Sequence, residues 1–421
     1  MASPLVTHRR VLAAALVGTS VEFYDFYVYA TAAALVFGPL FFPAESVAAQ
    51  QLLSFMSFGL AFVARPVGAI AFGHFGDRLG RKSTLVASLL LMGVSTLLIA
   101  FLPTYAMVGW VAPLLLCILR FGQGFGLGGE WGGATLLAVE NAPKGWEARF
   151  GSAPQLGAPV GFLCANGLFL LLGLSLTDEA FTSWGWRVPF LLSAVLVAIG
   201  LWVRLRIGET PAYQEALEQA PPPPVPLGTV LRHHWAPTLA ASAGVVSAFA
   251  IFYLSTAFTL SYLTAERDAA REAVLAVQLA ANLFLALGIV LAAIGSDKVG
   301  AQRMLAWGAA ATVLLGVAFG PGLAGGTMGM LLVLLAAALF VMGFVYGPLG
   351  GWMPTLFPVT VRYTGMSVAF NGGGIVGGAV APIAAQYLVA AGGASLVGLF
   401  LSAAGLLTLL GVTLGRPSAA G

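Results

Sequence analysis

The chain has 421 residues, of which 59% are hydrophobic and only 8% are charged, and its net charge is +3. Soluble domains carry about 25% charged residues, so this composition excludes an ordinary soluble protein. Apolar stretches long enough for a helix to cross a bilayer recur along the whole chain. We therefore predict an all-α protein with many membrane spans, and the small net charge gives no reason to expect a nucleic-acid partner.

Twelve apolar stretches are predicted to be transmembrane helices. The first is too long for a secretory signal peptide and contains two acidic residues, so we interpret it as a span. In chain order the predicted spans cover residues 11–37, 50–73, 83–102, 107–135, 150–174, 186–206, 236–262, 273–294, 303–320, 327–349, 364–390 and 394–414.

The longest connection between predicted spans covers residues 207–235. It contains the charged and proline-rich sequence GETPAYQEALEQAPPPPVP, which cannot span a membrane and is typical of a linker. This linker, expected on the cytoplasmic side, divides the chain into an N-terminal six-helix bundle at 1–206 and a C-terminal six-helix bundle at 236–421.

A short internal repeat supports the division into two bundles. GHFGDRLGRK at Gly73–Lys82 follows the second predicted span, and GSDKVGAQR at Gly295–Arg303 follows the eighth. Both are predicted to be short basic turns with an aspartate at matching positions, Asp77 and Asp297. The match indicates duplication of a six-helix unit.

The distribution of positive charge predicts the orientation in the membrane. With both termini cytoplasmic, most of the 19 lysines and arginines fall on the cytoplasmic side, as the positive-inside rule requires. Arg187, Arg267 and Arg271 fall outside, and Arg65 and Arg120 fall within spans. The cytoplasmic positions are Arg9, Arg10, Arg78, Arg81, Lys82, Lys144, Arg149, Arg204, Arg206, Arg232, Lys298, Arg303, Arg362 and Arg416.

Several motifs resemble those of the major facilitator superfamily. Gly73–Lys82 is similar to the superfamily's loop signature, and RFGQGFG at Arg120–Gly126 is similar to its fourth-helix motif. VEFYDFYVY, ARPVGAIAFGHFGDRLGRK, RFGQGFGLGGEWGGA, WGWRVPF and FPVTVRYTG narrow the resemblance to the metabolite:H+ symporter family. Members of that family carry proline/betaine, α-ketoglutarate, citrate and shikimate. The chain departs from the family pattern at Gly300–Arg303 and in the sequence FNGGG.

This resemblance implies the major facilitator fold, in which twelve transmembrane helices form two six-helix bundles and both termini are cytoplasmic. It also implies gradient-driven transport by alternating access, in which helices 1 and 4 face a central cavity. A multi-pass protein of the cytoplasmic (inner) membrane is therefore expected, and we expect it to be a monomer.

Charged residues inside predicted spans are few, and each needs a partner because burying a charge costs several kcal/mol. They are Glu22, Asp25, Arg65, Arg120 and Glu130. Asp25 and Arg120 fall near the centres of the first and fourth spans. Burial favours the neutral acid and a guanidinium favours the carboxylate, so making or breaking an Asp25–Arg120 pair is predicted to move a proton. A purely structural ion pair is the alternative.

Glu22 is a second candidate for the proton-carrying group. It precedes Asp25 by three residues and is expected on nearly the same helix face. Two neighbouring carboxylates disfavour double ionisation, so one of them holds a proton more tightly. Either acid can then carry the proton while the other pairs with Arg120, and the sequence leaves both assignments open.

Arg65 and Glu130 each have two interpretations. Arg65 is expected either to bind an anionic substrate bidentately or to pair with a carboxylate such as Glu130. Glu130 lies among glycines in GLGGEWGGA, where close helix packing favours a gating or packing salt bridge over contact with substrate.

A cytoplasmic gate is predicted at the two repeated turns. Asp77, with Arg78 and Arg81, is expected to pair with a neighbouring helix in one conformation only, and Asp297 is its counterpart in the second half. The alternative is a solvated loop whose basic residues only determine topology.

Polar side chains within the spans are candidates for binding substrate. Interhelical hydrogen bonds, or packing for the tyrosines, are the alternative for each of them. The candidates are Tyr24, Tyr27, Gln123, Gln155, Tyr253, Gln278, Asn282 and Asn371.

The sequence contains no pattern typical of an enzyme, a metal site or an ATP-binding site. It lacks GxxxxGK[ST], GxSxG and any metal-ligand spacing. We therefore predict a transporter that needs no cofactor and uses the proton gradient. Its expected function is proton-coupled symport of a small polar metabolite, an organic acid or a zwitterion, by alternating access. A proton-coupled exporter or an uncoupled facilitator with the same fold is the alternative.

Overall fold

A computed structural model describes most of the chain. The described residues are 7–79, 81–128, 130–206, 227–358 and 361–417, and among these the side chains of 10, 11, 73–85, 137 and 203–206 are not described. Below, the N-half is residues 7–206 and the C-half is residues 227–417. The described chain is helical and contains no β-strand.

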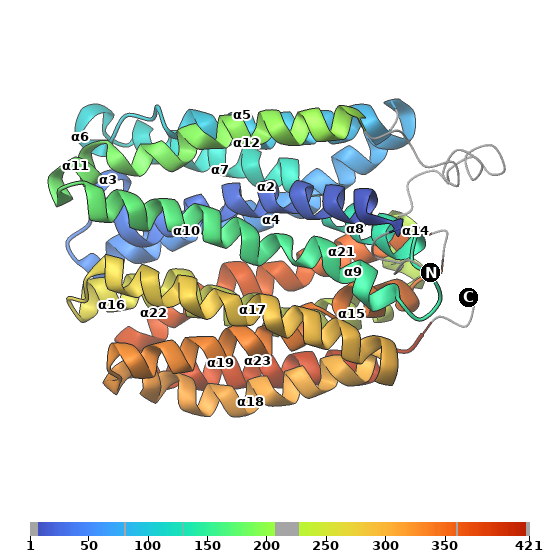
Figure 1. Ribbon diagram of the computed structural model, residues 1–421. Coiled ribbons are helices and arrows are strands. Elements are labelled where there is room, and N and C mark those ends of the chain that lie inside the picture. The colour runs from blue at the N-terminus through green and yellow to red at the C-terminus, as the bar shows by residue number, and fades with distance from the viewer. Residues whose placement is uncertain (1–6, 80, 129, 207–226, 359–360, 418–421) are drawn as a thin grey trace.

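The N-half consists of long helices that run across the molecule and short helices at their ends (Figure 1). In chain order they are α2 (Arg9–Ala32), η1 (Ala33–Phe37), α3 (Gly38–Phe41), α4 (Val47–Leu79), α5 (Arg81–Ile99), α6 (Tyr105–Val108), α7 (Val111–Leu127), α8 (Glu130–Glu140), α9 (Glu147–Gln155), α10 (Gly157–Ser175), α11 (Asp178–Ser183), η2 (Gly185–Arg187) and α12 (Val188–Arg206).

The C-half has a corresponding set of helices. They are α14 (Leu227–His233), α15 (Trp235–Tyr253), η3 (Leu254–Phe258), α16 (Thr259–Glu266), α17 (Arg271–Val299), α18 (Ala301–Gly325), α19 (Met328–Tyr346), α20 (Leu349–Trp352), η4 (Met353–Leu356), α21 (Arg362–Gly374), η6 (Ile375–Ala379), α22 (Val380–Gly392) and α23 (Ala394–Leu414).

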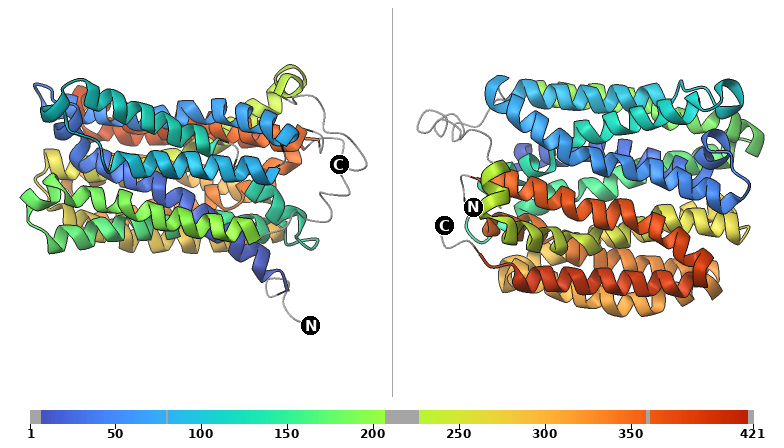
Figure 2. Two further views of the ribbon diagram at one scale, coloured as in Figure 1. Left: turned by 90° about the horizontal axis from the view of Figure 1, so that it is seen from above. Right: turned by 180° about the vertical axis from the view of Figure 1, so that it is seen from behind.

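The long helices lie roughly parallel to one axis, and the described chain begins and ends at the same end of the bundle (Figures 1 and 2). We call this the terminal end, and the opposite end, which carries α6 and α11, the far end. By length and composition, 10 helices of the described chain can cross a membrane. Since α2 and α5 are not among these, the count of twelve spans and the cytoplasmic position of the termini stay predictions.

Helix ends extend beyond the predicted spans at the terminal end. The sequence predicts a turn over Gly73–Lys82, but this is wrong for the part of the segment whose backbone is described. That part is helical, because α4 continues to Leu79 and α5 begins at Arg81. The second turn is confined to Gly300, whose φ of 98° is readily adopted only by glycine. Hydropathy identifies only the apolar part of a helix, which lies in the lipid bilayer. The helix itself can continue past the bilayer into water.

The predicted linker at 207–235 stays a prediction, and its last part contains a short helix. Residues 207–226 lie outside the described residues, but 227–233 form the helix α14 at the terminal end. The seventh long helix then starts at Trp235, within one residue of its predicted start.

Within the described residues, three π-helical turns interrupt long helices, and no sequence signal predicts them. Two of them, η1 and η3, occur in the first long helix of each half, after α2 and α15. The third, η6, joins α21 to α22. Such turns are rare and concentrate at functional sites. The matching positions of η1 and η3 agree with the predicted duplication.

The centre of the molecule is occupied by α15 with η3 and α16. In this span 94% of the most apolar window is buried, against 39–50% for the other candidate spans. Its neighbours pack closely because small residues stand at helix crossings. A Cβ on Gly343 of α19 would lie 2.5 Å from the backbone of Gly288 and Ile289 in α17.

Candidate functional site

Asp25 lies deep in the N-half, on α2, which packs against α12. Its side chain is 1% exposed. Ser193 Oγ on α12 donates a hydrogen bond of 2.5 Å to Asp25 Oδ1, and Thr96 Oγ1 on α5 lies 3.2 Å from Asp25 Oδ2. Two hydroxyl groups therefore solvate a carboxyl group that water does not reach.

The predicted direct pair between Asp25 and Arg120 is wrong for this conformation, because no ion pair joins them within the described part of the chain. They are connected instead through two polar side chains. Arg120 Nη1 donates to Gln123 Oε1 at 2.8 Å, and Gln123 Nε2 donates to Thr96 Oγ1 at 2.7 Å. The result is a continuous buried path of hydrogen bonds from the guanidinium to the carboxyl group.

Thr96 can adapt this path to either protonation state of Asp25. A hydroxyl group has one proton to donate, and Thr96 Oγ1 also lies 2.9 Å from the carbonyl oxygen of Met92. If Thr96 donates to Asp25, the acid accepts as a carboxylate. If Thr96 donates to Met92, the acid must be protonated to keep the bond.

Aromatic rings surround the two buried arginines. The Arg120 guanidinium carbon lies 4.2 Å from the Phe26 ring centre and 4.0 Å from that of Tyr29. The Arg65 guanidinium carbon lies 4.3 Å from the same Phe26 ring and 4.7 Å from the Phe62 ring. Cation–π attraction offsets part of the cost of burying these charges. The predicted Arg65–Glu130 pair is not found among the described ion pairs.

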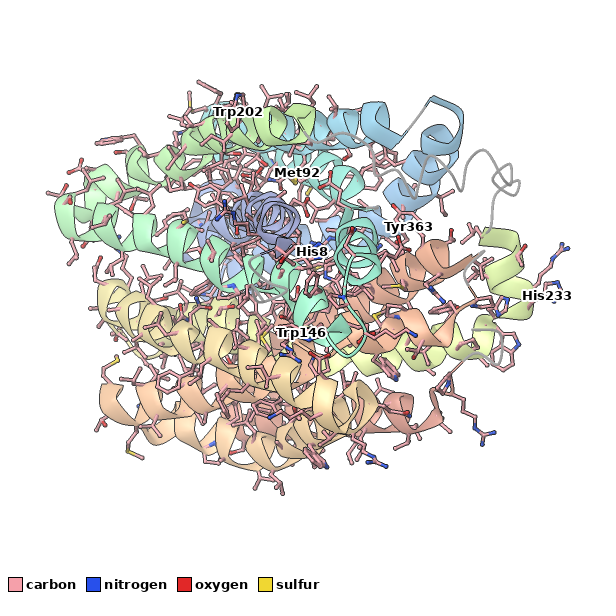
Figure 3. The ribbon with its side chains drawn as sticks, turned by 45° about the vertical axis from the view of Figure 1, so that its right-hand side comes forward. His8, Met92, Trp146, Trp202, His233 and Tyr363 are labelled. Carbon is pink, nitrogen blue, oxygen red and sulfur yellow. The ribbon has the colours of Figure 1, made fainter. Side chains whose placement is uncertain are left out.

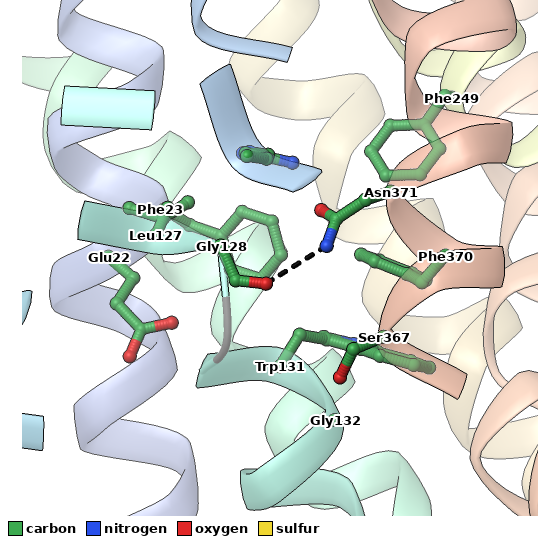
Figure 4. A pocket seen from close by; sticks show the side chains of 11 residues that line it. Glu22, Phe23, Leu127, Gly128, Trp131, Gly132, Phe249, Ser367, Phe370 and Asn371 are labelled. Atoms are coloured by element: carbon green, nitrogen blue, oxygen red, sulfur yellow. Dashed lines mark hydrogen bonds between the residues drawn. The ribbon is translucent and has the colours of Figure 1, made fainter. Parts of the chain in front are cut away.

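A small pocket, with an internal volume of about 30 Å³, lies between the two halves. Glu22 projects into it from α2 on one side, while Phe370 and Asn371 come from α21 on the other (Figure 4). Other lining residues are Phe23, Arg65, Leu127, Gly128, Trp131, Gly132, Phe249 and Ser367. Glu22 and Asp25 were predicted to lie on nearly the same face of the helix. Their surroundings differ, because side chains three residues apart on a helix point in directions that are about 60° apart around its axis.

Two contacts join the halves beside this pocket. The rings of Trp131 and Phe370 are stacked, with centres 3.7 Å apart and planes 6° apart. Asn371 Nδ2 donates to the carbonyl oxygen of Gly128 at 2.9 Å. Asn371 was predicted to be a candidate for binding substrate. In this conformation its side chain forms a hydrogen bond to the N-half instead, at the end of α7.

Two predicted substrate candidates have structural partners. The Tyr24 hydroxyl donates to the carbonyl oxygen of Pro189 at 2.8 Å. Gln278 Nε2 donates to the carbonyl oxygens of Ser255 and Thr256, at 3.1 and 2.8 Å, where the π-helical turn η3 frees backbone acceptors. These bonds favour the alternative of interhelical packing for both side chains.

Two other candidates keep a buried polar atom without a partner in the described structure. Gln155 accepts from Trp131 Nε1 at 3.2 Å, and its Nε2 has no acceptor. Asn282 donates to the carbonyl oxygen of Pro159 at 2.9 Å, and its Oδ1 has no donor. Such atoms are costly to bury unless something pairs with them at another time.

The two remaining tyrosine candidates pack between the halves. Tyr27 is 4.8 Å from the Phe252 ring and 5.6 Å from the Phe162 ring, measured between ring centres. Tyr253 lies 5.1 Å from the Phe58 ring. They form aromatic contacts across the interface.

Asp297 joins the halves at the terminal end. Arg149 Nε lies 2.6 Å from Asp297 Oδ2, and the backbone N–H of Ala148 donates to Asp297 Oδ1 at 2.9 Å. Asp297 thereby caps the first turn of α9 from the end of α17. The Arg149 guanidinium also stacks 3.6 Å above the ring of Trp146, a residue labelled in Figure 3.

A second ion pair joins the halves at the far end. Arg271 Nη2, at the start of α17, lies 2.8 Å from Asp178 Oδ1 of α11, and its guanidinium lies 3.9 Å from the Phe181 ring. The same helix α17 therefore bears one ion pair to the N-half at each end, and both are formed in this conformation.

The other predicted gating residues belong to the N-half. Glu130, at the start of α8, accepts a hydrogen bond from Ser88 of α5. The side chains of Asp77, Arg78 and Arg81 lie outside the described side chains.

Comparisons with known proteins agree with this architecture. The family profile described as "Sugar (and other) transporter" matches residues 11–220. The "Inner membrane metabolite transport protein YhjE" of Escherichia coli is 45% identical over 98% of this chain and 95% of its own length. The chain belongs to the major facilitator superfamily.

Other transporters of the superfamily match almost as completely. The "Shikimate transporter" of Escherichia coli is 37% identical over 90% of this chain and 88% of its own length. The solved structure of the D-xylose-proton symporter has a TM-score of 0.73, with 18% identity and 96% of both chains covered. At that identity the structural likeness shows the fold alone.

The family and fold predictions are therefore confirmed: the protein is a major facilitator transporter of metabolites, not an enzyme, and it resides in the cell membrane. No group of three or more metal-ligating side chains occurs in the described structure.

The sequence analysis did not identify the residues that form hydrogen bonds to the buried Asp25 or that join the two halves by ion pairs and ring stacking. Thr96 and Ser193 lie in no motif, and hydroxyl groups within spans are common. Trp131 lies in the motif GLGGEWGGA, but only the neighbouring Glu130 was singled out there. Arg149 and Arg271 were counted only as topology signals. For these two, a clue was available, because each has an acidic partner at the same end of the bundle, Asp297 and Asp178.

Proposed function

We propose that this transporter is a proton-coupled symporter of a small polar metabolite, an organic acid or a zwitterion, and that it works by alternating access. The observation that carries the proposal is the buried carboxyl group of Asp25, which two hydroxyl groups solvate and which a hydrogen-bonded path connects to Arg120.

Asp25 is the proposed proton carrier because Thr96 can accommodate both of its protonation states. Loss of the proton creates a buried negative charge, which Arg120 stabilises at a distance through Gln123 and Thr96. Gain of the proton removes that charge and leaves the guanidinium more weakly held. Protonation thus changes the forces that act between α2, α5 and α7.

The names of related proteins support the substrate class. One relative is a "Shikimate transporter", and another, from Dickeya dadantii, is a "Glycine betaine/proline/ectoine/pipecolic acid transporter". A structural neighbour is described as a D-xylose-proton symporter. The pocket between the halves is the proposed substrate site, with one chain as the working unit.

Gating is proposed to depend on the contacts between the halves at each end. The Arg149–Asp297 pair closes the terminal end, and Asp77, with Arg78 and Arg81, is proposed to act as the equivalent latch after α4. Release of the terminal pair would open the pocket toward the side on which both termini lie.

The test is transport by purified protein in proteoliposomes, after a thermal-shift screen against organic acids, betaines and amino acids has supplied a substrate. Asp25→Asn is expected to abolish accumulation driven by an inward proton gradient while sparing counterflow exchange. Asp268→Asn, the same change in an exposed acid between α16 and α17, serves as the matched control. Normal uphill accumulation by Asp25→Asn would remove Asp25 from the coupling mechanism, and gradient-driven efflux would make the protein an exporter.

A further inference from the structure

The helix α14 and the start of α15 form an exposed apolar face at the terminal end. Its side chains, Leu231, Trp235 and Leu239, are 54%, 59% and 61% exposed and stand four residues apart. Backbone hydrogen bonds of 2.9 and 3.1 Å between residues four apart continue the helical path across the junction of the two helices. Side chains at this spacing therefore share one face.

Such exposure is unusual for α15, which lies at the centre of the molecule. In its span 94% of the most apolar window is buried, and within α15 only Trp235 and Leu239 are large apolar side chains exposed at the surface. The span begins at Trp235, and tryptophan is enriched where membrane helices leave the hydrocarbon layer. The exposed face therefore lies at the level where lipid headgroups meet acyl chains.

Basic side chains border this face, and no acidic residue stands on the helices around it. Arg232 and His233 are exposed, and neither forms an ion pair within the described part of the chain. Arg232 precedes Trp235 by three residues, so the two side chains are neighbours on the helix surface, and His233 points away from the body of the protein (Figure 3).

The helix that carries these charges is fixed to the C-half. Val230 is completely buried, and α14 packs against α15 and α21. None of these three helices contains an aspartate or a glutamate, and α21 adds Arg362 at the same end. The surface is therefore a positively charged site of defined shape beside an apolar face.

From this arrangement we propose that α14 and the start of α15 bind an anionic phospholipid of the leaflet at the terminal end. Its phosphate contacts Arg232 and His233, and an acyl chain lies along Trp235 and Leu239. The bound lipid thereby contacts the central helix α15, which the protein otherwise shields. This end is the predicted cytoplasmic side, where anionic lipids give the leaflet its negative surface potential. The site is independent of the proposed substrate and of the proposed coupling ion.

The test measures the binding of added lipid to the full-length protein in detergent by native mass spectrometry. Palmitoyl-oleoyl phosphatidylglycerol is compared with phosphatidylcholine that has the same acyl chains but no net charge. Each basic residue near an anionic lipid is worth about fivefold in affinity. We therefore expect the first phosphatidylglycerol to bind at least fivefold more tightly than phosphatidylcholine. Glycerol 1-phosphate, which has the phosphate but no acyl chain, should not displace it.

Variants then assign the binding to residues. Arg232→Gln is expected to weaken phosphatidylglycerol binding about fivefold and to leave phosphatidylcholine binding unchanged, because only the charge contact is lost. Trp235→Ser is expected to weaken both lipids, because it removes part of the surface for the acyl chain. Arg303→Gln is the matched control, the same change in an exposed arginine of α18 at the same end, and should leave both affinities unchanged. All three side chains are exposed, so the variants should fold.

Equal affinities of the wild-type protein for the two lipids would overturn the inference, and so would equal losses in Arg232→Gln and Arg303→Gln. Displacement of the lipid by glycerol 1-phosphate would show a site for free anions instead. The preceding segment contains Glu209, Glu215 and Glu218. A preference for phosphatidylglycerol that arises only after these three are changed to glutamine would assign the surface to that segment and reject the lipid.

Discussion

Replacing Thr96 by valine tests the hydrogen-bonded path between Asp25 and Arg120. Valine has nearly the shape of threonine but no hydroxyl group, so the change removes the bond to Asp25 Oδ2 and the acceptor of Gln123 Nε2. Ser193 remains bound to the other carboxyl oxygen. The buried ionised form of the acid therefore loses one of its two hydroxyl partners.

The magnitude follows from that single bond. A hydrogen bond to a charged group contributes about 1.5–3 kcal/mol, and about 1.4 kcal/mol corresponds to one pH unit. Loss of the bond favours the neutral acid, so the alkaline limb of the pH profile of proton-driven uptake should move upward by about one to two pH units. The orphaned Gln123 amide should also lower stability by about 1–3 kcal/mol.

The assay is initial uptake into proteoliposomes as a function of external pH, combined with thermal unfolding of the purified protein. Thr312→Val is the matched control, since Thr312 is equally buried but bonds only to the carbonyl oxygen of Gly308 in its own helix. An unchanged pH profile in a folded Thr96→Val protein would refute the reasoning, as would an equal shift in Thr312→Val.

Further predictions concern the interface between the halves and helix packing. Asp297→Asn should weaken the closure at the terminal end, so spin labels at the exposed positions 144 and 303 should move apart in a pulsed distance measurement; an unchanged distance distribution would contradict this. Gly343→Ala should destabilise the protein by about 1–3 kcal/mol in thermal unfolding, because its Cβ would meet the backbone of α17. Gly18→Ala, with open space around its Cβ, should leave stability unchanged or raised, and equal effects of the two changes would argue against this packing.

Hydropathy predicted most of the fold because the bilayer imposes the length and apolarity of each span. The last helix, 394–414, matches its predicted bounds. The π-helical turns and the continuation of α4 to Leu79 were not predictable, since they depend on packing and on helix stability in water.

The buried charges of the site were also predictable, because a charged side chain in an apolar span is costly and faces the protein interior rather than lipid. Glu22, Asp25, Arg65, Arg120 and Glu130 are all buried. Their partners were not predictable in this way. Thr96, Ser193 and Phe26 look like ordinary membrane-helix residues, and only the rotation of each helix decides which of them meets a charge.

The two ion pairs of α17 differ in their exposure to the aqueous phases. The carboxylate of Asp178 is 93% exposed at the far end, whereas that of Asp297 is 3% exposed at the terminal end. Dissolved salt screens exposed charges within about 8 Å at physiological ionic strength and screens buried pairs much less. Ionic strength therefore acts on this carrier asymmetrically: salt at the far end loosens one closure, while salt at the terminal end leaves the other nearly untouched. With the predicted orientation, in which the termini are cytoplasmic, a cell in a salty medium would hold more of these carriers open toward the far end.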